Sequence, residues 1–474
     1  MNKPDALTLV IFGASGDLTR RKLMPALYLL YKAGRLPRRF AVLGMARTSY
    51  DDDRFRTSIR EGLLSFVRPD EVDEKAIHAF LSCLHYLSAD PSKPEAYAEL
   101  RIRLEEIDRT IDNPHNYLYY LATPPLLYGV IPRHLKAEGL NRDGDGFRRI
   151  VVEKPFGYDL SSALELNRIY LDAFREEQIY RIDHFLGKET VQNILALRFA
   201  NSVFEPLWNR NYIDYVEITA VENMGIGTRG GFYDGVGTLR DMVQNHLAQL
   251  LAVTAMEPPA AFDASGFRNE VVKVYQSLTP LTGEDIRHSV VRGQYMASEG
   301  RKGCREEEQV PTLSRTETYL AMRLELNNWR WGGVPFYIRT GKQMPTKVSE
   351  IVIHFKPAPY SLFRCEGGTC PVPNRLVIRI QPNEGIVLRI GMKKPGEGFE
   401  VLPMDMDFSY AELGRLPTED AYARLIEDCI AGDPTLFIRS DAVESGWRFF
   451  DPILKYLLDV QECPLYGYPE GSWG

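Results

Sequence analysis

The feature that most constrains the fold of this chain is a strand pattern that ends in a glycine turn and leads directly into a helix pattern. Residues 7–12 are a continuous apolar run, which is typical of a strand buried on both faces of a sheet. Gly13 and Gly16 follow it, and a helical pattern then covers residues 19–31. Strand and helix patterns keep alternating up to residue 183, which predicts a doubly wound parallel sheet.

The pattern changes after about residue 199. Between residues 212 and 392 the strand patterns alternate apolar and polar residues, and turns rich in Gly, Pro and Asn join them. A long helical pattern covers residues 238–256. The second half therefore predicts a large, mostly antiparallel sheet with helices on one face. We expect an α/β plus α+β protein with two domains, residues 1–199 and 200–474.

Charge and composition exclude several classes of protein. The net charge is -7, which argues against bulk binding to nucleic acid or to an anionic membrane surface. No stretch approaches the roughly 20 apolar residues of a membrane-spanning helix. Residues 1–6 lead directly into a strand pattern and leave no room for a signal peptide, so we expect a cytoplasmic protein.

The six cysteines do not predict a disulfide framework or a metal site. They are spread thinly along the chain, and only Cys365 and Cys370 lie close together in sequence. No second pair accompanies them, as a tetrahedral zinc site would require. We expect two free thiols in a loop and no bound metal.

The turn after the first strand is the first candidate ligand site. Ligands of doubly wound sheets bind at the carboxyl ends of the strands, where a glycine turn and a helix N-terminus favour phosphate. This predicts dinucleotide binding, although a tight turn without a ligand has the same pattern. The candidate cofactor-binding residues are Gly13, Ala14, Ser15, Gly16, Asp17 and Leu18.

Arg47 follows the second strand, at a position where NAD enzymes usually carry an acidic residue. A guanidinium group suits the 2′-phosphate of NADP, so the sequence favours NADP over NAD. The alternative is a surface arginine at the edge of the sheet. Lys154 also lies at a strand end, before Pro155, where it could bridge cofactor and substrate; alone it is a weak signal.

The stretch 181–189 concentrates an acid, an imidazole and an ammonium group at the end of a strand pattern. Strand alternation predicts that Asp183 and His184 point to opposite sides. His184 and Lys188, with the helix that begins there, then form an anion pocket, while Asp183 faces a base that needs orienting. A solvated turn with a chance mixture of charges is the alternative.

His246 is the candidate base. On a helical wheel it lies in an apolar stripe, which is also typical of a core histidine with a satisfied hydrogen bond. A buried carboxylate that fixes its tautomer would make it a general base. Glu222, Lys342 and Lys347 also end or follow strand patterns, but their spacing alone predicts no more than solvated charges.

Five motifs occur in the same order as in glucose-6-phosphate dehydrogenases, and the chain closely resembles that family. They are Gly-Ala-Ser-Gly-Asp-Leu at 13–18, Glu-Lys-Pro-Phe-Gly at 153–157, Arg-Ile-Asp-His-Phe-Leu-Gly-Lys-Glu at 181–189, Arg-Asp-Met-Val-Gln-Asn-His at 240–246 and Arg-Thr-Gly-Lys at 339–342. The resemblance implies a Rossmann-like NADP-binding domain and a β+α domain that binds substrate and forms homodimers or homotetramers. It also implies oxidation of glucose 6-phosphate at C1 to 6-phosphogluconolactone with reduction of NADP, the first oxidative step of the pentose phosphate pathway.

The resemblance also implies roles for individual residues. His246 takes the proton from the C1 hydroxyl, and Asp183 orients and stabilises its imidazolium. His184 and Lys188 bind the 6-phosphate, and Arg47 matches the arginine that contacts the 2′-phosphate of NADP.

The remaining implied roles concern the sugar. Glu222 and Asp241 bind its hydroxyl groups, and Lys342 and Lys347 line the same site. Lys154 lies between sugar and nicotinamide. A different NADP-dependent sugar oxidoreductase on a similar plan and a non-catalytic phosphosugar or NADP sensor remain the alternatives.

Two positions fit the family pattern less closely: Lys347, where members often carry arginine or lysine, and position 185. Position 185 usually carries a tyrosine whose hydroxyl helps to hold the phosphate, and this chain has Phe185. A missing hydrogen bond to a charged partner costs about 1.5–3 kcal/mol. We therefore expect a weakened affinity for the phosphosugar.

Overall fold

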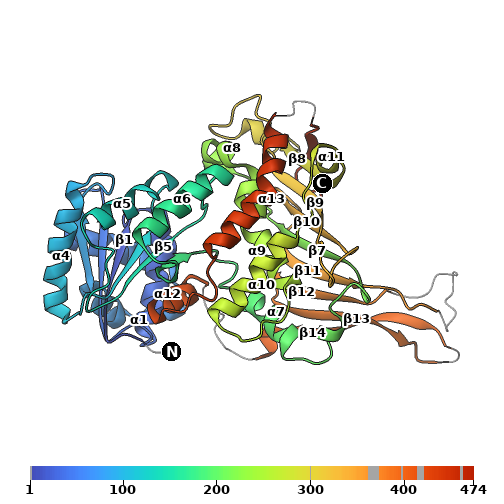
Figure 1. The fold of residues 1–474 in the computed structure, drawn as a ribbon, viewed down its shortest axis with the longest axis horizontal. Coiled ribbons are helices and arrows are strands. Elements are labelled where there is room, and N and C mark those ends of the chain that lie inside the picture. Colours follow the sequence, from blue (N-terminus) through green and yellow to red (C-terminus); the bar gives the residue numbers. More distant parts are fainter. Residues whose placement is uncertain are drawn as a thin grey trace. The chain divides into compact units, whose positions relative to one another are not determined.

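The computed structural model describes residues 3–298, 300–360, 373–396, 399–413, 421–459 and 463–473 (Figure 1). Cys365 and Cys370 lie outside these residues. The chain forms two compact units: Met1–Gly187 with Ala261–Arg268 and Glu419–Glu444, and Lys188–Ala260 with Asn269–Thr418 and Ser445–Gly474. The expected domain division after residue 199 stays a prediction.

The first unit contains a six-stranded parallel sheet in the order β3-β2-β1-β4-β5-β6. Every residue of the two central strands, β1 and β4, is buried, which explains their continuous apolar runs. The predicted doubly wound sheet is confirmed. Its strands are β1 (Ala6–Phe12), β2 (Arg39–Ala46), β3 (Leu84–Ser88), β4 (Tyr117–Leu121), β5 (Arg148–Val152) and β6 (Ile179–Arg181).

Helices connect these strands, and side-chain caps fix where several of them begin. The carboxylate of Asp51 accepts a hydrogen bond from the Arg54 N–H at the start of α2, and Asp159 and Ser162 cap α6 reciprocally. The helix α12 packs against α1 although it is distant in sequence. The helices of this unit are α1 (Met24–Lys32), α2 (Asp52–Phe66), α3 (Glu74–Ser82), α4 (Glu95–Ile111), α5 (Val130–Ala137), α6 (Leu160–Ala173) and α12 (Ala421–Ala431).

The second unit contains a nine-stranded sheet in the order β14-β13-β12-β11-β7-β10-β9-β8-β15. Its neighbours pair antiparallel except β7 with β10 and β8 with β15, so the predicted mostly antiparallel sheet is confirmed. Its strands are β7 (Ile213–Val221), β8 (Val290–Met296), β9 (Tyr319–Glu325), β10 (Pro335–Gly341), β11 (Val348–Phe355), β12 (Arg375–Gln381), β13 (Gly385–Lys393), β14 (Val401–Ser409) and β15 (Tyr466–Pro469).

The helices α7 and α9 pack against each other, and α7 also packs against β12; Figure 1 draws both on the same side of the sheet. None of the helices in the described part of the chain has the length and apolar character needed to cross a membrane. Besides α12, the helices after residue 187 are α7 (Glu189–Phe199), α8 (Gly230–Thr238), α9 (Ala248–Ala255), α10 (Ala264–Ser277), α11 (Gly283–Ser289) and α13 (Ser440–Asp459).

The continuous helix expected over residues 238–256 is wrong in one respect. Gly237 has a φ of 72°, and the segment Leu239–Leu247 that follows it is π-helical before α9 begins. The buried carboxylate of Glu317 accepts the Leu239 N–H at 3.1 Å, and the Asn245 amide donates to the Arg240 carbonyl at 2.7 Å. Glu317 thus caps an N–H at the start of the segment, and Asn245 satisfies a carbonyl that a regular helix would pair internally. Turns of π-helix occur often at functional sites.

Candidate functional site

The turn after β1 has a backbone that only glycine adopts easily. Gly13 has a φ of 84°, and a Cβ atom there would lie 2.2 Å from the Ala122 carbonyl oxygen at the end of β4. The Gly13 N–H donates to the Met45 carbonyl oxygen at 2.8 Å, which ties the turn to β2. The turn therefore lies over the ends of three neighbouring parallel strands, where a backbone can approach a phosphate closely.

The other five residues of this turn differ in accessibility. Ala14 is buried, Gly16 and Leu18 are half-buried, and Ser15 and Asp17 are exposed. The Asp17 carboxylate lies 3.4 Å from a guanidinium nitrogen of Arg21. Only the backbone of the turn and the Ser15 hydroxyl are thus open to an anion.

Arg47 is exposed and directly follows β2. Its neighbour Thr48 donates a hydrogen bond from its hydroxyl to the Ser15 hydroxyl at 2.8 Å. The arginine and the glycine turn therefore meet at one edge of the sheet. An exposed guanidinium beside this turn can pair with a phosphate group through two charge-assisted hydrogen bonds.

Lys154 lies after β5, half-buried, and its peptide bond to Pro155 is cis. The preceding Glu153 is buried and accepts a hydrogen bond from the Tyr120 hydroxyl at 2.5 Å. Burial raises the pKa of the Glu153 carboxyl to about 7, although Tyr120 and Lys154 both act to lower it. A titratable group near neutrality therefore lies at the carboxyl end of the parallel sheet.

The stretch 181–189 begins as a strand but leaves it early. β6 ends at Arg181, so strand alternation does not determine the directions of Asp183 and His184, contrary to the sequence argument. Asp183 is buried, and its carboxylate accepts the Phe185 N–H at 2.9 Å. The His184 ring stacks on Tyr422, with 6.1 Å between centroids and 7° between planes.

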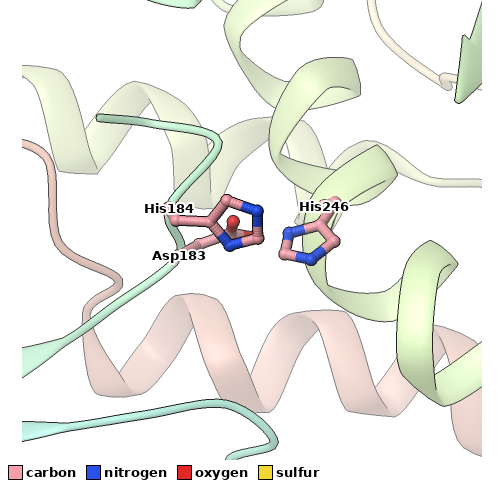
Figure 2. Close-up of side chains that lie close together, drawn as sticks. All are labelled: Asp183, His184 and His246. Carbon is pink, nitrogen blue, oxygen red and sulfur yellow. The ribbon is translucent and has the colours of Figure 1, made fainter. Parts of the chain in front are cut away.

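A glycine closes this loop because nothing larger fits. A Cβ atom at Gly187 would lie 2.7 Å from the Ala421 carbonyl oxygen at the start of α12. Figure 2 shows that Asp183 and His184 project from this loop after β6, whereas His246 projects from the π-helical segment Leu239–Leu247. His246 is buried, as its apolar stripe predicted.

Lys188 precedes α7 and donates a hydrogen bond from Nζ to Oε1 of Gln381 at 2.7 Å. Gln381 is the last residue of β12, and its amide also donates to the Ser349 hydroxyl at 3.1 Å. The hydrogen bond to Gln381 therefore helps to hold the ammonium group in place.

Lys342, Glu222 and Asp241 form one cluster. Lys342 is buried, and its Nζ lies 2.6 Å from Oε2 of Glu222 and 3.7 Å from Oδ2 of Asp241. The parallel strands β7 and β10 end together, with Val221 opposite Gly341, so the residue after each strand reaches the same place. Two carboxylates fixed by one ammonium group are suited to accept hydrogen bonds from the hydroxyls of a polyol.

Two models of a single protein family match the chain almost from end to end. The NAD binding domain of glucose-6-phosphate dehydrogenase matches residues 10–193, and the C-terminal domain of glucose-6-phosphate dehydrogenase matches residues 195–474. The chain belongs to the glucose-6-phosphate dehydrogenase family.

Members of this family are similar to the chain over its whole length. Glucose-6-phosphate 1-dehydrogenase of Aggregatibacter actinomycetemcomitans is 52% identical, covering 100% of this chain and 94% of that protein. The one of Treponema pallidum is 48% identical, covering 98% and 91%. A solved structure of glucose-6-phosphate dehydrogenase in complex with its substrate glucose-6-phosphate has a TM-score of 0.92 and 34% identity, and the match covers 100% of this chain and 96% of that one.

The glucose-6-phosphate dehydrogenase motifs do not include every polar residue at these places. Tyr120 and Gln381, which bond Glu153 and Lys188, gave no sequence signal because each reads as an ordinary residue of a strand pattern. Lys347 is exposed and forms no hydrogen bond or ion pair with any residue that the structure describes. Lys347 directly precedes Val348, which pairs with Val221 of β7. Lys347 and Glu222 therefore lie at the same end of these two strands.

Proposed function

We propose that this chain oxidises glucose 6-phosphate at C1 to 6-phosphoglucono-1,5-lactone and reduces NADP, the first oxidative step of the pentose phosphate pathway. The observation that carries the proposal is the end-to-end family match. The solved relative that contains glucose 6-phosphate supports the choice of substrate.

His246 is the proposed general base, and Asp183 the proposed group that orients it. Removing the proton from the C1 hydroxyl builds the electron density that expels a hydride from the same carbon. The nicotinamide of NADP, when bound, supplies the hydride acceptor. The burial of both His246 and Asp183 supports this assignment, because a buried carboxylate that stabilises an imidazolium acts with little competition from water.

The sugar is proposed to bind through two sets of side chains. His184 and Lys188 hold the 6-phosphate, and the stacking of His184 on Tyr422 and the bond from Lys188 to Gln381 support fixed positions for both. Glu222 and Asp241 accept hydrogen bonds from the hydroxyls.

Two lysines complete the proposed sugar site. Lys342 holds the carboxylates of Glu222 and Asp241 in place, and this contact supports its role. Lys347 is proposed to line the same site.

NADP is proposed to bind to residues 13–18, Arg47 and Lys154 at the carboxyl ends of the parallel strands. The space above Gly13 that a Cβ atom would fill and the exposed guanidinium of Arg47 support the fit of a phosphorylated dinucleotide. By the same resemblance we propose that residues 1–199 form the coenzyme domain and residues 200–474 the substrate and assembly domain. A homodimer or homotetramer in the cytoplasm completes the proposal.

The test is an assay of the purified protein with glucose 6-phosphate and NADP, followed by the absorbance of NADPH. We expect a substrate-dependent rise, and its absence overturns the proposed activity in favour of a sensor. His246→Asn should abolish turnover and leave phosphosugar binding largely intact. His288→Asn, at an exposed position on α11, is the matched control and should retain turnover. Turnover by His246→Asn removes His246 as the base.

A further inference from the structure

A cavity of about 680 Å³, wide open to solvent, lies in the second unit, at the strand ends opposite the Lys342 cluster. Its lining comes from the segment before β7, the segment after α9 and the turn before β10. Lys342 follows the other end of β10, a strand of seven residues. At about 3.3 Å per residue, this strand separates the two places by roughly 20 Å, and the size of the cavity is that of a small-molecule site.

Trp329 is the most unusual side chain in this cavity, because its indole is 86% exposed. The nearby Trp208 and Trp331 are fully buried, and each donates its indole N–H to a backbone carbonyl. They form the core here, so Trp329 is not needed for packing. An exposed indole face beside a cavity offers a stacking surface for a planar group.

Arg210 places a positive charge over one face of this indole, and the large exposed area of Trp329 leaves room for a planar group to stack. Its guanidinium carbon lies 5.4 Å from the centre of the Trp329 ring. Within the described residues this guanidinium forms no ion pair or side-chain hydrogen bond. The backbone carbonyl of Arg210 accepts a hydrogen bond from Lys356 at 2.7 Å, which brings a second cation nearby.

The carboxylates of the cavity are already neutralised. Arg198 lies 3.1 Å from Glu205, and Arg330 pairs with both Glu205 and Glu257 and donates to the Trp208 carbonyl at 2.7 Å. The hydrogen bond from Arg330 lowers the pKa of Glu257, although burial acts to raise it. These contacts pair both carboxylates with cations, so Arg210 is the charge of the cavity that can attract an anionic ligand.

We propose that this cavity binds a nucleotide, with its base stacked on Trp329 and its phosphate paired with Arg210. Stacking on an exposed aromatic ring accepts any base, and a guanidinium group pairs with phosphate through two charge-assisted bonds. Both features are required together, because neither a neutral nucleoside nor inorganic phosphate uses the whole cavity. The site is separate from the strand ends to which NADP is assigned.

Calorimetric titration with AMP tests this proposal, because AMP carries both a base and a phosphate. Trp329→Leu and Arg210→Gln should each remove one binding step or weaken it about tenfold or more, while Trp329→Phe and Arg210→Lys retain most of it. These variants should still bind AMP at the coenzyme turn, residues 13–18. A lower number of AMP molecules bound per chain therefore reports the loss of the site beside Trp329. Adenosine and inorganic phosphate should each bind this site at least tenfold more weakly than AMP.

Circular dichroism of each variant shows whether it folds, and both substituted side chains are exposed. The proposal is overturned if Trp329→Leu and Arg210→Gln bind AMP with the stoichiometry and affinity of the parent chain. It is equally overturned if the parent chain binds no AMP at millimolar concentration, or if adenosine binds this site as tightly as AMP.

Discussion

Nζ of Lys342 lies 2.6 Å from Oε2 of Glu222, although 120 residues separate them. The parallel pairing of β7 with β10 produces this contact. It is one of two parallel pairs in an otherwise antiparallel sheet. A parallel pair brings two carboxyl ends together, and the residue after each strand then shares one place. The hydrogen bond from Lys342 in turn fixes the orientation of the Glu222 carboxylate.

Lys342→Gln should weaken both substrate binding and the fold. It removes the cation that holds Glu222 and Asp241, and a lost hydrogen bond between charged groups costs about 1.5–3 kcal/mol. We expect the KM for glucose 6-phosphate to rise at least about tenfold, and the free energy of unfolding to fall by about 1–3 kcal/mol. Steady-state kinetics and urea denaturation measure the two effects.

Lys347→Gln is the control for stability, since this lysine is exposed and forms no ion pair with the described residues. Its free energy of unfolding should change by less than about 0.5 kcal/mol. Equal losses of stability in the two variants contradict the role of the Lys342 contact.

Arg47→Gln should change the coenzyme preference. A guanidinium that pairs with the 2′-phosphate contributes to binding NADP but not NAD, so the KM for NADP should rise about tenfold or more while that for NAD stays within about twofold. Arg38→Gln is the control, because Arg38 is an exposed arginine just before β2 and Arg47 follows the other end of that strand. Equal changes for the two coenzymes show that Arg47 does not contact the extra phosphate.

The architecture could be predicted because the local pattern of apolar and polar residues reflects which faces of each strand are buried. The continuous apolar runs of β1 and β4 reflect strands covered on both faces, and the alternation in β12 reflects a strand with one buried face. Each of these signals lies within a few residues. The turn at Gly13 was also predictable, since its glycine answers a local backbone requirement.

The contacts of the site were less predictable, because they depend on pairing between distant segments. No local pattern links Lys342 to Glu222, or Lys188 to Gln381. The π-helical turn that carries His246 was missed for a similar reason, since the carboxylate that caps its first residue comes from Glu317, far along the chain. A helical wheel with 3.6 residues per turn cannot represent that segment.

Phe185→Tyr should strengthen phosphosugar binding. The ring of Phe185 is buried and lies edge-on to His184, with 5.2 Å between centroids, so an added hydroxyl extends beside the imidazole assigned to the phosphate. A hydrogen bond to a charged phosphate contributes about 1.5–3 kcal/mol, which predicts a KM lower by about tenfold or more. Initial rates at varied glucose 6-phosphate measure it, and an unchanged KM contradicts the prediction.

Gly13→Ala should destabilise the fold and abolish coenzyme binding. A left-handed φ costs an alanine about 1–2 kcal/mol, and its Cβ would also lie 2.2 Å from the Ala122 carbonyl oxygen. The control is Gly34→Ala, since Gly34 has a φ of 66° but no atom within 4 Å of a built Cβ. Denaturant unfolding should show a clearly larger loss for Gly13→Ala, and equal losses contradict the steric argument.

Glu153→Gln should stabilise the fold, and the gain should grow with pH. Burial raises the pKa of Glu153 from 4.5 to about 7, so the folded protein keeps this carboxyl protonated at pH values where the unfolded chain has ionised it. In the parent chain, the Glu153 carboxyl makes its full contribution to the free energy of unfolding below pH 4.5, and this contribution is lost as the pH rises to about 7. Above that pH the folded chain carries the full cost of an ionised, buried Glu153 carboxylate, on the order of 3 kcal/mol.

Glutamine does not ionise and its oxygen can still accept the hydrogen bond from Tyr120, so the variant isolates the charge. Urea unfolding between pH 4.5 and 8 should therefore show a difference between variant and parent that rises up to about pH 7 and then stays level. Glu99→Gln, at an exposed position on α4, should change the free energy of unfolding by less than about 0.5 kcal/mol at every pH. A difference for Glu153→Gln that does not vary with pH shows that this carboxyl ionises alike in the folded and unfolded chain.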